Sequence, residues 1–224
     1  MDIIGHRGAS GHAPENTLKA FDLALEMGCK WLELDVHVAS NRLLVIHDES
    51  LERTTTGRGL LSEHPLETLR NLDAGDGEQI PFLDEVLDLV NGQAVINIEL
   101  KGLGTAKPVS RLLNTWCQER DVSPDRFLLS SFNHGELNDA DTRYQRAALF
   151  GRLPDDAIEQ TLALGAGYLN ASLRSMTEAW VDRAHRAGLK VAVYTVNELE
   201  DIQRMDDWGV DAIFCDYPGR ALTL

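Results

Sequence analysis

Short apolar runs alternate with amphipathic stretches along the whole chain. Nine runs have the length and the Val, Ile and Leu content of buried parallel strands. They cover residues 3–5, 31–38, 43–46, 94–100, 127–131, 147–150, 168–170, 191–196 and 212–215. Between them, apolar residues recur at helical spacing, as Leu18, Phe21 and Leu25 do before Gly28. Strands that alternate with helices predict an α/β protein.

The order helix, glycine, strand repeats along the chain, at Gly28, Gly165, Gly188 and Gly209. Glycine is the residue that most often ends a helix, so each repeat indicates one βα unit. If residues 43–46 extend the excursion of the second strand, the chain holds about eight units, which predicts a (β/α)₈ TIM barrel. A doubly wound open sheet is the alternative. No Gly-x-Gly-x-x-Gly turn follows the first strand, which weakens a dinucleotide-binding interpretation.

One segment breaks this rhythm. From Asp48 to about Phe82 the chain is polar and rich in turn residues. It is too long for a simple connection in a compact domain. We therefore expect a small insertion after the second strand, over the mouth of the barrel. No shift in composition marks a boundary, so residues 1–224 are expected to form a single domain.

Composition narrows the classes of function. The 224 residues are 43% hydrophobic and 25% charged, as in globular proteins, and the formal net charge of −15 argues against a nucleic-acid partner. Three scattered cysteines indicate a reducing compartment. No apolar run reaches the roughly 18 residues of a membrane span. The N-terminus has no leader pattern, so we expect a cytoplasmic protein, or a mature form whose leader is missing.

Three acidic residues interrupt the most apolar runs. Because strand side chains alternate, Glu33 and Asp35 share one face, and Glu99 occupies the next long strand. Acids at the carboxyl ends of barrel strands lie where barrel active sites form. Carboxylates crowded in a space of low dielectric repel one another unless a cation joins them, and their oxygens suit Mg²⁺ or Ca²⁺. The structural alternative for each is a salt bridge or a helix cap.

Two histidines and two cations accompany these acids. His6 and His47 each follow a buried strand and are candidate general acid and base. Arg7 and Lys101 either balance the carboxylates or bind a phosphate group. The combination favours cleavage of a phosphate ester over cleavage of a peptide or a glycoside. His37, further out on the face of the acids, is a weaker candidate for substrate contact. The remaining histidines are expected to be structural: His12, His64, His134 and His185.

An ordered set of short motifs runs through nearly the whole chain. They are His6-Arg7-Gly8, Pro14-Glu15-Asn16-Thr17, Glu33-Leu34-Asp35-Val36, His47-Asp48, Arg53-Thr54-Thr55, Ile98-Glu99-Leu100-Lys101, Ser130-Ser131-Phe132, Tyr194-Thr195-Val196-Asn197 and Asp216-Tyr217-Pro218. In order and spacing the set resembles the glycerophosphodiester phosphodiesterase family. No single motif is specific, but the ordered set is.

The resemblance implies a TIM barrel with a small inserted lid that hydrolyses glycerophosphodiesters to sn-glycerol 3-phosphate and an alcohol. It implies the following site residues: Glu33, Asp35 and Glu99 as ligands of a divalent metal, His6 and His47 as the catalytic pair, Arg7 and Lys101 on the phosphate, and Tyr194 in the pocket wall. We expect His6 to be the base and His47 the acid. The nucleophile is either water or the substrate's glycerol 2-hydroxyl. Tyr194 stands where the family often has tryptophan, which leaves the preferred alcohol open, and the oligomeric state, a homodimer included, is open too.

Two other functions compete with this interpretation. A barrel similar to the phosphatidylinositol-specific phospholipases C also pairs histidines at its mouth, but it requires membrane contact. The net charge of −15 and the lack of a basic and aromatic surface patch argue against it. A non-catalytic phosphodiester-binding barrel would lack a histidine or an acidic ligand, and this chain has all of them.

Overall fold

The computed structural model describes residues 1–223. All nine predicted strands are present. They are β1 (Asp2–His6), β2 (Trp31–Ala39), β3 (Arg42–Val45), β4 (Val95–Leu100), β5 (Phe127–Ser131), β6 (Gln145–Phe150), β7 (Tyr168–Ser172), β8 (Lys190–Tyr194) and β9 (Ala212–Cys215). Eight of them pair in parallel, and the pairing of β1 with β2 closes the barrel. This closed ring of eight parallel strands confirms the predicted TIM barrel. The remaining strand, β3, is antiparallel to β2.

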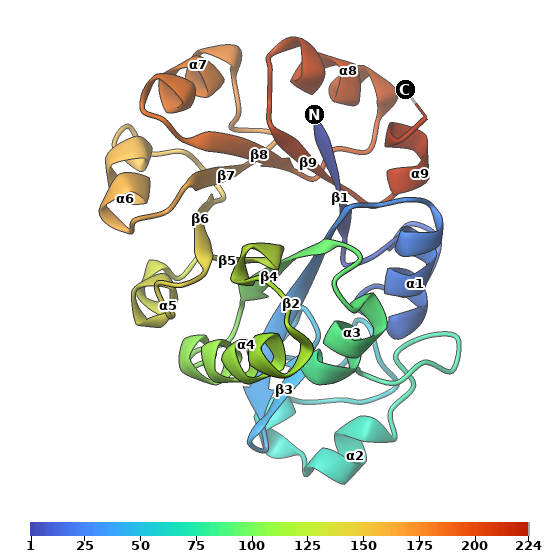
Figure 1. The fold of residues 1–224 in the computed structure, drawn as a ribbon. Coiled ribbons are helices and arrows are strands. Elements are labelled where there is room, and N and C mark those ends of the chain that lie inside the picture. The colour runs from blue at the N-terminus through green and yellow to red at the C-terminus, as the bar shows by residue number, and fades with distance from the viewer. Residues whose placement is uncertain (224) are drawn as a thin grey trace.

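Helices surround this barrel (Figure 1). They are α1 (Leu18–Glu26), α2 (Leu66–Arg70), α3 (Leu83–Val90), α4 (Ala106–Arg120), α5 (His134–Asp139), α6 (Ala157–Ala163), α7 (Glu178–Arg186), α8 (Leu199–Asp207) and α9 (Pro218–Ala221). Thr17 caps α1 by accepting a hydrogen bond from the Ala20 N–H, which frees Asn16 for another role. No helix within residues 1–223 is both long and apolar enough to cross a membrane.

Side-chain alternation along β2 positions the site. Leu32, Leu34 and Val36 face outward and are buried against the surrounding helices, with Phe21 of α1 in the same apolar cluster. The residues between them face the barrel interior. The hydrophobic burial of one face of the strand therefore forces Glu33 and Asp35 to the inside, where they are 2% and 0% exposed.

The segment 48–82 has a small apolar cluster of its own. It contains a 3₁₀ turn, Leu61–Glu63, and the short helix α2. Leu51, Leu61 and Leu69 pack there with Leu44 of β3, and all are buried. Figure 1 shows α2 beside β3 at the side of the barrel. Anchored by this cluster, the segment reaches the barrel mouth through residues 48–53.

Candidate active site

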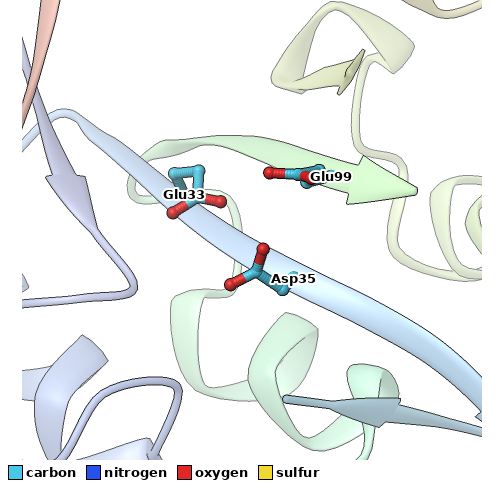
Figure 2. Close-up of side chains that lie close together, drawn as sticks. All are labelled: Glu33, Asp35 and Glu99. Atoms are coloured by element: carbon cyan, nitrogen blue, oxygen red, sulfur yellow. The ribbon is translucent and has the colours of Figure 1, made fainter. Parts of the chain in front are cut away.

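Three buried carboxylates converge inside the barrel. Glu33 and Asp35 project from β2, and Glu99 projects from β4, where the strand register sets it beside Asp35. One oxygen from each carboxylate lies within 4.8 Å of the other two. Figure 2 shows the three side chains gathered around a common space. The sheet thus brings together all three residues that the sequence indicates as metal ligands.

This cluster crowds negative charge among side chains that are almost completely buried. Burial, reinforced by the Asp35 carboxylate, raises the pKa of Glu33 well above its usual range. The same causes raise the pKa of Glu99 to about 7. Burial also opposes ionisation of Asp35, but the charges of Arg7 and Lys101 outweigh it and hold the pKa of Asp35 below its usual value. The positive charge near Glu33 and Glu99 is therefore too small to offset the cost of ionising them.

The donor set fits a hard divalent cation. Asp35 Oδ1 is buried and accepts no hydrogen bond from residues 1–223, and Lys101 Nζ is 3.7 Å from it, so this oxygen has unused capacity to bind a cation. Mg²⁺ and Ca²⁺ prefer such carboxylate oxygens, and two oxygens on opposite sides of a Ca²⁺ ion lie up to about 5 Å apart. The separations in the cluster stay within 4.8 Å. A cation there would also relieve the repulsion that raises the pKa values of Glu33 and Glu99.

His6 is oriented by a carboxylate that is remote in the sequence. His6 is the last residue of β1. Its Nδ1 hydrogen-bonds to Asp216 Oδ1 at 2.7 Å, and its Nε2 lies 4.0 Å from Glu33 Oε2. Asp216 also accepts hydrogen bonds from Ser10 Oγ at 3.0 Å and Asn197 Nδ2 at 2.7 Å. Burial opposes its ionisation, but the contact with His6 and the hydrogen bonds from Asn197 and Ser10 together outweigh burial and bring the pKa of Asp216 to about 2. Asp216 therefore holds Nδ1 and leaves Nε2 toward the acids.

His47 has a comparable partner. Its Nδ1 hydrogen-bonds to Asp48 Oδ1. Arg53 donates to Asp48 Oδ2 and makes two hydrogen bonds to Glu15, of 2.7 and 2.9 Å. The hydrogen bond from Arg53 is the main cause that brings the pKa of Asp48 to about 2. Burial, assisted by the charge of Arg7, lowers the pKa of His47. An anionic phosphate beside Arg7 would oppose this second cause.

Arg7 binds the acids through both its backbone and its side chain. It adopts the left-handed region, with φ of 56°, and its N–H donates to Glu33 Oε2 at 3.0 Å. This conformation costs a non-glycine residue about 1–2 kcal/mol, and here it aims the N–H at the cluster. The guanidinium donates to Glu15 Oε1 at 2.8 Å, and its Nε lies 3.2 Å from Asp35 Oδ2. Arg7 thus joins the metal candidates to the Arg53 network.

Lys101 and Asn16 complete the surroundings of Asp35. Lys101 Nζ lies 2.9 Å from Glu99 Oε1 and 3.7 Å from Asp35 Oδ1. Asn16 Nδ2 donates to Asp35 Oδ2 at 2.9 Å, and Asn16 Oδ1 accepts from the Asp35 N–H at 3.3 Å. Lys101 therefore balances charge, as one interpretation expects, and also borders the cavity, as phosphate recognition requires.

A cavity of about 280 Å³, which we call the main cavity, opens over this cluster. Its lining includes most of the predicted site residues: His6, Arg7, Glu33, His47, Glu99, Lys101 and Tyr194. Asp35 lies below the surface of the cavity, with no exposed area. One wall is aromatic, because the Tyr194 ring makes edge-to-face contacts with Phe132 and Phe214 at 5.9 and 6.2 Å between centroids. The Tyr194 hydroxyl donates to the Phe150 carbonyl at 2.8 Å, so its ring forms the wall.

The sequence of this chain, taken from residue 6 to residue 220, matches the sequence model of the glycerophosphoryl diester phosphodiesterase family. The chain belongs to this family. The glycerophosphodiester phosphodiesterase of Caldanaerobacter subterraneus subsp. tengcongensis is 33% identical, over 99% of this chain and 96% of the relative. That of Bacillus altitudinis is 34% identical, over 99% and 97%.

Solved structures agree with this membership. The structure of an Oleispira antarctica phosphodiesterase in complex with the product sn-glycerol-3-phosphate superposes with a TM-score of 0.91 at 30% identity, covering 100% of this chain and 96% of that one. A glycerophosphodiester phosphodiesterase from Agrobacterium tumefaciens gives a TM-score of 0.83 at 28% identity, with both chains covered completely. The fold and the family thus agree over the whole length of the chain.

Several residues of this phosphodiesterase family member escaped prediction from the residues alone. Asp216 and Asp48 orient the histidines, and Arg53 connects Asp48 to Glu15. All four belong to the quoted motifs, and Asp216 directly follows a predicted strand, as His6 and His47 do. That position after a strand was the available signal. His37 does not line the main cavity, and its Nε2 hydrogen-bonds to the His47 carbonyl at 3.0 Å.

Proposed function

We propose that the chain hydrolyses glycerophosphodiesters to sn-glycerol 3-phosphate and an alcohol, with His6 and His47 as the proton-transfer groups. One observation carries the proposal. Two imidazoles, each held at Nδ1 by a carboxylate, border one cavity with two cations and two of the three clustered acids. Family membership supports it, since the family is defined by this class of reaction. The Oleispira antarctica structure, which contains sn-glycerol-3-phosphate, supports the product.

Glu33, Asp35 and Glu99 would hold a divalent metal, Mg²⁺ or Ca²⁺, in this proposal. When bound, such an ion supplies Lewis-acid stabilisation of a non-bridging phosphate oxygen. Arg7 and Lys101 donate to the phosphate oxygens and offset the charge that builds up in the transition state. Both cations border the main cavity, and their contacts with Asp35 keep them there. Arg7 and Lys101 therefore serve both purposes in this proposal, because the contacts that balance the charge of Asp35 also hold the two cations where they can bind the phosphate.

The histidines move the protons. His6 Nε2 accepts a proton from the attacking oxygen while the new P–O bond forms, and Asp216 stabilises the resulting imidazolium. His47 donates a proton to the alcohol oxygen as its P–O bond breaks, so that neutral alcohol leaves. Asp48 holds His47 in the orientation that this transfer needs. In sum, one water is added to each diester.

The deciding experiment measures sn-glycerol 3-phosphate released from glycerophosphocholine with Mg²⁺ or Ca²⁺. His6→Ala and His47→Ala should each lower kcat by about 10²–10⁴. His185→Ala is the matched control, because His185 is bound only to the surface residue Asp211 and lies outside the main cavity. Full activity of either active-site variant would remove that histidine from the mechanism. Full activity in excess chelator would show that the reaction does not need the metal. Absence of product with every substrate and ion would refute the proposed function.

A further inference from the structure

A second cavity, which we call the side cavity, lies between the segment 48–82 and the carboxyl ends of β2 and β4. Its volume is about 260 Å³, close to that of the main cavity. Lys101 lines both, so a single cationic side chain borders two chambers. None of the roles described above uses the side cavity.

The side cavity lies next to His47. His37 lines it and hydrogen-bonds through Nε2 to the His47 carbonyl, and Glu49, two residues after His47, lines it as well. The aromatic wall of the main cavity lies instead beside His6, whose ring meets Phe214 edge to face at 6.3 Å. A phosphodiester extends two arms from one phosphorus. With the phosphate beside Lys101, each arm therefore has a chamber adjoining it.

The lining of the side cavity combines apolar surface with one anion. Val38 is 37% exposed and Leu103 is 82% exposed, and both border it with the buried Leu61. These three side chains give the side cavity an apolar surface on which alkyl groups can pack. The Glu49 carboxylate is exposed and forms no hydrogen bond or ion pair with the described part of the chain, residues 1–223. Apolar surface beside a free carboxylate complements an alkylammonium group.

From this arrangement we infer that the side cavity is the subsite for the leaving alcohol and that it selects alcohols carrying an alkylammonium group. The inference rests on the proposed function. The methyl and methylene groups of such an alcohol pack on Val38 and Leu103, and its positive charge lies near Glu49. Lys101 holds the phosphate at the border and keeps a cationic alcohol out of its own immediate vicinity by repulsion.

The test compares two substrates of the same shape. One is glycerophosphocholine, and the other is the 3,3-dimethylbutyl ester of glycerol 3-phosphate, in which an uncharged carbon replaces the nitrogen. The ratio of their kcat/KM values isolates the contribution of charge. Glu49→Gln should lower this ratio by about two- to fivefold, the size expected of an exposed ion pair, and high salt should shrink the difference. Glu49→Lys should lower the ratio further.

Matched variants keep the outcome interpretable. Glu67→Gln removes the same charge from the same segment, at an exposed residue of α2 outside the side cavity, and should leave the ratio unchanged. Leu103→Ser should lower kcat/KM for both bulky esters relative to the methyl ester of glycerol 3-phosphate, whose alcohol is too small to reach Leu103. An unchanged ratio in Glu49→Gln, or an equal drop in Glu67→Gln, would overturn the subsite while hydrolysis itself continued. Hydrolysis of neither ester by the unaltered protein would instead refute the proposed function.

Discussion

The substitution Asp216→Asn preserves the size of the side chain and reverses its hydrogen bond to His6. Asn197 Oδ1 accepts the Asp216 N–H at 2.8 Å, which fixes the amide and points its Nδ2 at Asp216 Oδ2. Only an oxygen satisfies a donor at that place. The carboxamide oxygen of the variant must take it, so the NH₂ group faces His6 Nδ1. His6 then carries its proton on Nε2, where it cannot accept another from the nucleophile.

The expected loss follows from this change of tautomer. A positioned general base contributes about 10²–10⁴ to the rate, and replacing the aspartate behind the histidine of a serine protease costs about 10⁴. We therefore expect kcat to fall by about 10²–10⁴, with a smaller effect on KM. Stability should change less, because one hydrogen bond to a charged group contributes about 1.5–3 kcal/mol. In a chain of this size that corresponds to a decrease in Tm of several degrees.

The pH dependence gives a second, independent readout. The pKa of Asp216 is about 2 in the fold, against an ordinary 3.8. A carboxylate whose pKa is depressed by folding stabilises the fold above its unfolded pKa, and this contribution is lost as the pH falls through its folded pKa. The difference in Tm between the unaltered protein and Asp216→Asn should therefore be full above about pH 4 and shrink toward pH 2.

The assay is the release of sn-glycerol 3-phosphate under saturating substrate, with circular dichroism to confirm folding. Ser10→Ala is the control, since it removes the other hydrogen bond to the same oxygen, Asp216 Oδ1, without changing which atom faces His6. It should retain most of the activity. A folded Asp216→Asn variant whose kcat stays within about tenfold of the unaltered protein would refute the orientation of His6 as the source of its reactivity.

Three further predictions concern the metal candidates and the segment 48–82. In chelator, the free energy of unfolding should decrease as the pH rises from 4.5 toward about 7, because folding raises the pKa of Glu99 and the unfolded chain ionises first. Thermal melts should show this decrease, and added Ca²⁺ should oppose it. A stability that does not change over this pH range would contradict the prediction. Arg53→Met should lower kcat/KM about tenfold, the equivalent of one charge-assisted hydrogen bond, and Arg58→Met, an exposed arginine of the same segment, should not; equal effects would exclude a specific role. Leu69→Ala removes a fully buried side chain and should cost about 2–5 kcal/mol in urea unfolding; a cost below that of Leu66→Ala, which is only partly buried, would contradict the proposed packing.

Local rules of the chain are sufficient for much of this protein. Burial of Leu32, Leu34 and Val36 requires Glu33 and Asp35 to occupy the other face of the same strand, whatever that strand pairs with. The strand runs, the helix-ending glycines and the interruption from residue 48 are likewise properties of neighbouring residues. All nine strands and the barrel were predictable on this basis.

The completed site depends on contacts that no local pattern encodes. His6 and Asp216 are 210 residues apart and meet because β1 pairs with both β2 and β9 when the barrel closes. Arg53 meets Glu15 because the apolar cluster of the segment 48–82 holds it against β3. The side cavity exists only where that segment faces β2 and β4. Side-chain periodicity sets which face a residue occupies, but the closure of the sheet decides which distant residue it faces.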